Sequence, residues 1–334
     1  MLRAVLRITL IAIWLLPLPA AAAPIKLKLA YLSSDRTLLY LASIKPFVDA
    51  VNAEANGLLE IEVFFSGALG KEHTRQADLV RDGKADIAYI IPGYENRLSD
   101  NAVIELPGLF RDQREASLVF TRMIAANALR GYDEFVVITA FTIEPHSIHT
   151  RQPIASLADL KGLKIRANSA TQGRTLEKLG MQGIVIPLIQ IGNAISTGTI
   201  DGAAITPAVL TEFGVGRMAS YHYMMQANPP SFAVVMNRKT FYALPERAQD
   251  IIRKYSGEWS VARANEILEN TNAKAIEQLK SDPRRTVIFP SQTDLVQIQA
   301  TFKSVINDWV AQDPHNGVLL STAEAEIAKL RLGQ

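Results

Sequence analysis

Residues 25–31 read IKLKLAY, an alternation of apolar and polar side chains with the two-residue period of a β-strand. LEIEVFF at 59–65 and DIAYII at 86–91 are predicted to be the next two strands, the second of them closed by a Pro-Gly turn. The segments between them, 39–55 and 71–81, are predicted to be helices, and the first carries an apolar face made of Leu41, Ile44, Phe47, Val48 and Val51. Strands that alternate with helices in this way favour a parallel sheet covered by helices.

The same alternation continues towards the C-terminus. We expect strands at 135–141, 163–166, 183–186, 203–206, 231–237 and 286–289. We expect helices at 114–129, 171–179 and 189–197, one long helical region at 245–279, and two more helices after it. No internal repeat or flexible linker separates these elements, and a chain of this length usually divides into two domains. The predicted fold class is therefore α/β, with two domains between which the chain crosses several times.

The first residues are typical of a secretory signal peptide. Arg3 and Arg7 form a basic segment, residues 8–18 are almost wholly apolar, and three alanines at 21–23 supply the small residues of a cleavage site. A membrane anchor is disfavoured because the apolar run is shorter than the roughly 20 residues that span a bilayer. We therefore expect residues 1–23 to be removed and the mature chain to be located in the periplasm.

Charge and cysteine content exclude several classes of function. The chain has 35 basic and 33 acidic side chains, and without the two arginines of the signal the numbers become equal. A neutral mature chain lacks the clustered basic charge that binding to nucleic acid or to anionic lipid requires. The absence of cysteine excludes disulfides, thiol nucleophiles and cysteine-ligated metals.

The motifs of common enzyme classes are missing from the sequence. It contains no G-x-S-x-G, H-E-x-x-H or P-loop motif, and no G-x-G-x-x-G after a strand. Its histidines are at positions 73, 146, 149, 222 and 315, and the spacing of His146 and His149 in an extended segment points their side chains to opposite faces. A metal site needs three or four convergent ligands. We therefore expect no metal, no cofactor and no catalytic activity, which favours a binding protein.

Four groups of residues occur in an order and spacing that resemble a known family. They are FSGALGKE at 65–72 followed by GKADIA at 83–88, ELPGLFRD at 105–112, SLADLKGLKIR at 156–166, and GTIDG at 198–202. In this arrangement the chain resembles the DctP-type substrate-binding subunits of TRAP transporters, which are tripartite and ATP-independent. The likeness extends over nearly the whole mature chain, from about Lys26 to Trp309.

This resemblance implies a two-lobed periplasmic-binding-protein fold with mixed sheets wrapped by helices. The ligand cleft lies between the lobes, a long helix spans both, and closure over the ligand presents the protein to a membrane permease. We expect lobe I to comprise residues 24–148 and 232–275, and lobe II to comprise residues 149–231 and 276–334. The expected partners are a small organic acid and the TRAP permease subunits, and the protein is expected to be a monomer.

The resemblance assigns the ligand's carboxylate to Arg166, the last residue of SLADLKGLKIR. Independent physical arguments agree with this role. Sheets of α/β proteins bind ligands beyond the carboxyl ends of their strands, and a guanidinium matches a carboxylate with two parallel hydrogen bonds. The alternative is an ordinary surface arginine. Asn168 follows Arg166 closely and is a further candidate for ligand contact.

The residues expected around the carboxylate depart from the family pattern at Thr206. After the Asp-Gly of 201–202, the family commonly has an asparagine that hydrogen-bonds the same carboxylate, and the matching residue here is Thr206. A threonine donates one hydrogen bond but lacks the separate donor and acceptor of an amide. Thr206 either contacts the ligand or caps the helix that follows Pro207, and the sequence leaves both possibilities open.

Several aromatic residues are expected at strand ends that face the cleft. They are Tyr31, Tyr89, Tyr94, Phe141 and Phe232. For Tyr89, Phe141 and Phe232 a place in the core or hinge is an equally good interpretation. Together these residues favour a monocarboxylate with an apolar or aromatic body, which the protein captures for a permease. A periplasmic enzyme or a sensory binding protein acting on a small organic acid are the alternatives.

Overall fold

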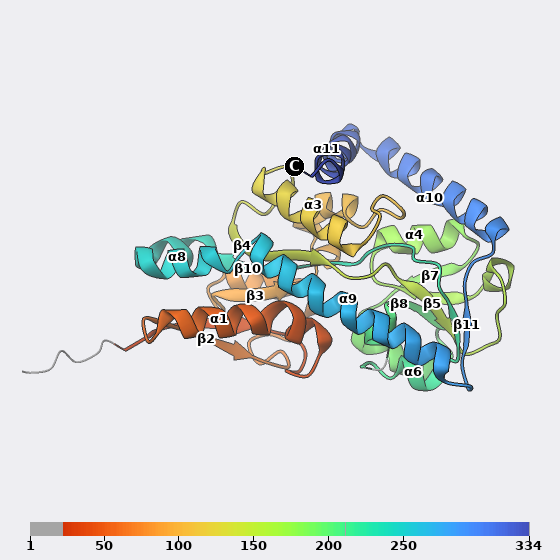
Figure 1. Cartoon of the computed structure of the whole chain (residues 1–334), viewed down its shortest axis with the longest axis horizontal. Coiled ribbons are helices and arrows are strands. Elements are labelled where there is room, and N and C mark those ends of the chain that lie inside the picture. Colours follow the sequence, from red (N-terminus) through yellow and green to blue (C-terminus); the bar gives the residue numbers. More distant parts are fainter. Residues whose placement is uncertain (1–22, 211, 334) are drawn as a thin grey trace, which may run out of the picture.

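The computed structural model describes residues 23–210 and 212–333, which form the two lobes shown in Figure 1. Residues 1–22 of the predicted signal peptide lie outside the described residues, so its cleavage stays a prediction. Within the described ranges, no helix has both the length and the apolar character needed to cross a bilayer.

Lobe I contains a five-stranded sheet in the order β2-β1-β3-β10-β4. Three of its strands, β1 (Ile25–Ala30), β2 (Leu59–Phe64) and β3 (Ile87–Ile90), are parallel. β10 (Ser231–Asn237) returns from the other lobe and lies antiparallel between β3 and β4 (Phe135–Thr142). This returning strand makes the sheet mixed rather than purely parallel.

Lobe II contains a six-stranded sheet in the order β11-β9-β5-β8-β6-β7. β5 runs antiparallel to both of its neighbours, whereas the other pairs are parallel. The strands are β5 (Ser147–Thr150), β6 (Lys164–Ala167), β7 (Gln182–Val185), β8 (Gly202–Ile205), β9 (Tyr221–Tyr223) and β11 (Thr286–Ile288). The sequence analysis does not expect β5 or β9, which are short strands of 4 and 3 residues.

Helices cover both sheets, and several depart from the expected boundaries; α2 begins at Gln76 rather than 71, and α3 ends at Ala125 rather than 129. The region expected to be one helix at 245–279 is divided into α8 and α9 at Gly257, whose φ of 63° lies outside the helical range. A π-helix at Tyr40–Ile44 precedes α1 and leaves Leu41 39% exposed, so its expected place on the buried face is wrong. The α-helices are α1 (Lys45–Ala55), α2 (Gln76–Arg81), α3 (Gln113–Ala125), α4 (Ala170–Lys178), α5 (Ile191–Ser196), α6 (Val215–Met218), α7 (Arg238–Ala243), α8 (Glu246–Lys254), α9 (Glu258–Ser281), α10 (Gln292–Gln312) and α11 (Pro314–Arg331).

Two helical segments join the lobes. α9 packs against β4 and α3 of lobe I and against β11 of lobe II, so this long helix spans both lobes (Figure 1). α10 packs on α4 of lobe II, whereas α11 packs on α3 of lobe I and buries Leu319, Ala323 and Ile327 in the core of that lobe. The expected assignment of residues 276–334 to lobe II therefore needs a correction. The chain leaves lobe II at Asp313, which is extended (φ −152°) and ends α10, and α11 belongs to lobe I.

Candidate ligand-binding site between the lobes

The local structure of residues 156–166 places Arg166 in its strand. Ser156 and Asp159 form a capping box, in which the Asp159 carboxylate accepts from the backbone N–H of Ser156 at 2.9 Å, and this starts a short 3₁₀ turn. The two leucines of that turn are buried in the core of lobe II. Gly162 then adopts a φ of 77°, which favours glycine, and the chain turns into β6.

The neighbouring strand β8 fixes the position of β6. The carboxylate of Asp201 accepts from the backbone N–H of Lys164, and the Asp201 N–H donates to the Lys164 carbonyl, both at 2.8 Å. Gly202 follows, and a Cβ at this position would overlap the carbonyl oxygen of His149 in β5. The segments 156–166 and 198–202, which carry the family resemblance, therefore meet in the sheet and bring Arg166 to the carboxyl end of β6.

The guanidinium of Arg166 is buried, with only 2% of the residue exposed. It donates from Nε to the Ile186 carbonyl (3.0 Å), from Nη1 to the Ala204 carbonyl (3.2 Å) and from Nη2 to the Tyr94 hydroxyl (3.5 Å). A guanidinium has five N–H donors, so two of them have no protein acceptor among the described residues. Burial lowers the pKa of Arg166, and no carboxylate in the described ranges forms an ion pair with it. The site therefore holds a cation without a protein counter-charge.

Arg166 lines a cavity of about 40 Å³ that is formed by residues of both lobes. Three other predicted site residues line it: Tyr94, Asn168 and Phe232. Four predicted site residues lie outside its lining: Tyr31, Tyr89, Phe141 and Thr206. The remaining lining residues are mostly apolar: Leu39, Ile91, Ile143, His146, Leu188, Ile205, Val209 and Pro230. Among the described residues of this lining, Arg166 is the one permanently charged side chain.

Four of the five predicted aromatic residues, Tyr31, Tyr89, Phe232 and Phe141, form one row of neighbouring rings in lobe I. The ring centroids of Tyr31 and Tyr89 are 5.2 Å apart, those of Tyr89 and Phe232 are 5.8 Å apart, and those of Phe232 and Phe141 are 5.5 Å apart. Phe65, which follows β2, extends the row at 6.3 Å from Tyr31. Phe232 thus contributes to the cavity wall, and the other rings pack behind it. Their direct contact with a ligand stays a prediction.

Thr206 makes a hydrogen bond that neither sequence interpretation anticipates. Its hydroxyl donates to the carbonyl of Glu144 at 2.8 Å, in the segment that crosses from lobe I to lobe II. The side chain makes no capping hydrogen bond to the short turn that begins at Pro207. Because a hydroxyl has a single proton to donate, that proton is committed to the protein backbone in this structure.

His146 is a site residue that the sequence suggests only as a possible metal ligand. It lies between β4 and β5, where its backbone N–H donates to the Asn228 carbonyl of the returning segment at 3.2 Å. Gln172 of α4 approaches the ring at Nδ1. Burial and the charge of Arg166 lower the pKa of His146 to about 3, so the ring is neutral near pH 7. Among residues 23–210 and 212–333, no three His, Asp or Glu side chains gather in an arrangement that could hold a metal.

Two carboxylates connect the lobes around the cavity. Glu105 of lobe I accepts from the Ser231 hydroxyl at 2.6 Å and from the Ser169 hydroxyl of lobe II, and burial raises the pKa of Glu105. Glu212 of lobe II accepts from the backbone N–H of Leu38 in lobe I at 2.7 Å. The contact of Glu105 with Ser169 and the contact of Glu212 with Leu38 join the two lobes, so both would break if the lobes separated.

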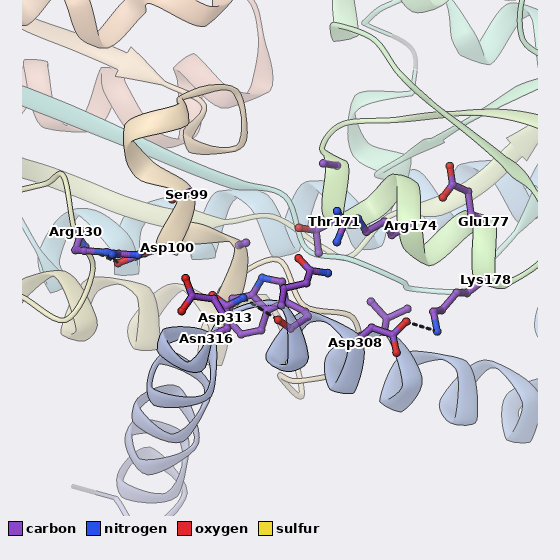
Figure 2. A pocket seen from close by; sticks show the side chains of 15 residues that line it. Ser99, Asp100, Arg130, Thr171, Arg174, Glu177, Lys178, Asp308, Asp313 and Asn316 are labelled. Atoms are coloured by element: carbon purple, nitrogen blue, oxygen red, sulfur yellow. Dashed lines mark hydrogen bonds and ion pairs between the residues drawn. The ribbon is translucent and has the colours of Figure 1, made fainter.

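A larger hollow of about 690 Å³ lies between α4, the lobe I segment 99–102 and the elbow that joins α10 to α11 (Figure 2). Its charged side chains are largely paired with one another, as Arg130 is with Asp100 and Lys178 with Asp308. Arg174 also lines this hollow but is exposed, so water satisfies its charge. The larger hollow therefore lacks the buried, uncompensated cation that distinguishes the smaller cavity.

Comparison with known proteins agrees with this geometry. The model of the family "bacterial extracellular solute-binding protein, family 7" (DctP) matches residues 29–313. A curated solute-binding protein of Albidiferax ferrireducens is 22% identical over 227 residues, which are 64% of this chain and 65% of that relative, so the match spans slightly less than two thirds of the relative's length.

Two solved structures share the fold over almost their entire length. A TRAP solute binding protein from Rhodoferax ferrireducens T118, in complex with copurified benzoate, is 25% identical with a TM-score of 0.84, and the match covers 93% of this chain and 100% of that one. A TRAP solute binding protein from a marine metagenome, specific for aromatic acid ligands, is 24% identical with a TM-score of 0.83, and the match covers 91% of this chain and 99% of that one. With the family match over most of the sequence, the chain belongs to the DctP family, family 7 of the bacterial extracellular solute-binding proteins.

Proposed function

We propose that the protein captures a small organic monocarboxylate in the cavity between its lobes and delivers it, in the periplasm, to the membrane permease subunits of a TRAP transporter. One observation carries this proposal. Arg166 is buried at the junction of the lobes and has no carboxylate partner among the described residues. Membership of the solute-binding family supports the transport role.

The electrostatics of Arg166 favour an anionic ligand. Transfer of an isolated charge into an apolar environment is strongly unfavourable unless the charge is paired and hydrogen-bonded. The backbone carbonyls of Ile186 and Ala204 satisfy part of the guanidinium but carry no net charge. A carboxylate supplies the missing charge and accepts the two remaining N–H donors in parallel. The bound acid therefore completes an ion pair of which the protein provides one half.

The rest of the lining favours a ligand whose body is apolar or aromatic. Leu39, Ile91, Leu188 and Val209 lie on the cavity wall together with Phe232, and the described lining residues include no second cation for a second carboxylate. A heavily hydroxylated ligand would leave many hydroxyl groups unpaired against such a wall. The related structure with copurified benzoate supports the same ligand class.

Ligand entry requires the lobes to move apart. The cavity of about 40 Å³ is smaller than the roughly 150 Å³ that holds a benzene ring in a protein core. Two segments join the lobes beside the cavity, and they pair through two hydrogen bonds: the His146 N–H donates to the Asn228 carbonyl, and the Ala227 N–H donates to the His146 carbonyl. We propose that these segments act as a hinge, that the lobes open to admit the acid, and that they close again over it. The cavity offers no nucleophile beside a free base, so we propose binding without catalysis.

A thermal-shift experiment tests the proposed ligand class. Benzoate and other small monocarboxylates are compared with their neutral analogues, benzamide and benzyl alcohol, on the mature protein. A ligand at 100 times its Kd stabilises the folded state by about 2.7 kcal/mol, so the melting temperature rises with acid concentration. We expect stabilisation by acids, none by the neutral analogues, and loss of the acid effect in Arg166→Ala.

Arg174→Ala is the matched control, because this arginine lines the larger hollow instead. It should retain the response of the native protein. Equal stabilisation by acids and neutral analogues would refute the proposal. Loss of the response in Arg174→Ala rather than in Arg166→Ala would move the ligand site to the larger hollow.

A further inference from the structure

The ring of His146 differs from the other polar groups of the cavity because its protonation pattern follows from its neighbours. The backbone N–H of Asn168 donates to Oε1 of Gln172 at 2.9 Å. A backbone N–H only donates, so the atom that it contacts must be the oxygen of the Gln172 amide. The orientation of this amide is thereby determined by the protein backbone.

The orientation of the amide in turn determines the tautomer of His146. The other end of the Gln172 amide, Nε2, lies 2.9 Å from Nδ1 of the imidazole, which is closer than Oε1 at 3.3 Å, and Oε1 already accepts from the Asn168 N–H. An amide NH₂ only donates, so Nδ1 of His146 accepts, and the neutral ring carries its proton on Nε2. Gln172 is fully buried, with 0% exposed, so water does not compete for these hydrogen bonds.

The resulting Nε2–H donor has no partner in the protein. In the described part of the chain, no acceptor forms a hydrogen bond with Nε2 of His146. The residue is 3% exposed and lines the same cavity as Arg166. Because His146 lines the cavity, a ligand oxygen placed there can accept the hydrogen bond that no described protein group accepts.

We infer that the Nε2–H of His146 is a second donor to the carboxylate of the ligand, beside the guanidinium of Arg166. The inference rests on the proposed function and deepens it. Thr206 donates its only proton to the Glu144 carbonyl and does not line the cavity. The neutral imidazole of His146 therefore serves as the uncharged donor in the cavity. Gln172 is the positioning residue, because it holds the ring in the tautomer that donates.

This arrangement makes the site selective for ligands that accept rather than donate. Arg166 and His146 both present hydrogens to the cavity, so a carboxylate satisfies both, whereas the NH₂ group of an amide satisfies neither. His146 remains neutral at neutral pH, because burial and the Arg166 charge oppose its protonation. It therefore contributes direction and hydrogen bonding without adding a second positive charge.

Nitrogen NMR of the native protein labelled with ¹⁵N-histidine tests the inference directly. The signals of His146 are identified by their loss in His146→Phe. At pH 7 without ligand, we expect Nδ1 to be unprotonated and Nε2 to carry the proton. Saturation with benzoate should shift the Nε2–H proton of His146 and leave the ring signals of His73 unmoved. A native ring protonated on Nδ1, or an Nε2–H signal that benzoate does not move, would overturn the inference.

Binding measurements on variants provide a second readout. His146→Phe should bind benzoate about tenfold or more weakly, and His146→Gln, which keeps a side-chain donor, should lose less. Gln172→Leu removes the group that donates to Nδ1 of His146, so the imidazole proton should distribute over both ring nitrogens. Benzoate binding should then weaken, although Gln172 itself does not line the cavity. His73→Gln is the control and should bind as the native protein does.

The two proposals fail in different ways. If no carboxylate stabilises the native protein, the proposed function is refuted and the role of His146 falls with it. If benzoate binding depends on Arg166 but is the same in native protein and in His146→Phe, only the role of His146 is refuted.

Discussion

Replacement of Arg166 by lysine and by alanine should weaken carboxylate binding in two distinct steps. Two of the five guanidinium donors have no protein acceptor in the described chain. Hydrogen bonds to charged groups contribute about 1.5–3 kcal/mol each, so loss of both in Arg166→Ala should remove about 3–6 kcal/mol. At 1.4 kcal/mol per factor of ten, this is an affinity about 10² to 10⁴ times lower.

Arg166→Lys keeps the charge but loses the planar pair of donors. An ammonium is a compact charge without the parallel geometry of the guanidinium. We therefore expect about one of the two hydrogen bonds to be lost, which weakens binding about 10- to 150-fold. Isothermal titration with the acid that stabilises the native protein most measures both steps.

The stability of the ligand-free variants provides the control for these affinities. Arg166→Ala leaves two carbonyls without their donor, at about 1–3 kcal/mol each, but it also removes an uncompensated buried cation, which acts in the opposite direction. We expect the free energy of unfolding to change by no more than about 2 kcal/mol, so weaker binding cannot be attributed to unfolding. If Arg166→Lys bound the acid as tightly as the native protein, or if Arg166→Ala lost less than about threefold, the bidentate account of the site would be refuted.

Three further predictions concern the framework of the site. Burial lowers the pKa of His222 from 6.5 to about 4, so the unfolded chain takes up this proton first as the pH falls. The free energy of unfolding should therefore fall by about 3 kcal/mol between pH 6.5 and pH 4. Urea titrations should show a weaker dependence of this free energy on pH in His222→Asn, and an equal dependence in both proteins would contradict the prediction. Gly202→Ala should destabilise the protein by about 1–3 kcal/mol in the same assay because its Cβ overlaps a carbonyl of β5, whereas Gly317→Ala in α11, where a Cβ meets its nearest neighbour at 3.7 Å, should be neutral or stabilising. Ser169→Ala removes both the cap of α4 and a contact with Glu105 that joins the lobes. It should cost about 1 kcal/mol of stability and increase the radius of gyration of the ligand-free protein in small-angle scattering. An unchanged radius would show that this contact does not hold the lobes closed.

The features that the sequence predicted well are those determined by neighbouring residues. Alternation predicted β1 and short apolar runs predicted the other strands of the lobe I sheet, and β10 has the predicted bounds, 231–237. The segment 156–166 contains its own capping box and glycine turn, so the position of Arg166 at a strand end could be predicted from it. The placement of the mixed sheets in two lobes also agrees with the family resemblance.

The features that the sequence did not predict depend on contacts between distant segments. The donor role of His146 requires Gln172 and the backbone of Asn168, which a different element supplies. Thr206 loses its free proton only because the crossing segment places the Glu144 carbonyl beside it. α11 packs on lobe I because the extended residue Asp313 separates it from α10. An amphipathic pattern predicts which face of a helix is buried, but it does not predict which lobe the helix packs against.

A crystal structure of the protein with the acid that stabilises it most tests the central claim most directly. The measured quantities are the distances from the two carboxylate oxygens of the ligand to the guanidinium nitrogens of Arg166. The account predicts both oxygens within about 3 Å of these nitrogens, in the range of charge-assisted hydrogen bonds, with the body of the ligand against Phe232. A carboxylate that points into solvent, or that binds elsewhere while Arg166 keeps only its backbone partners, would contradict it.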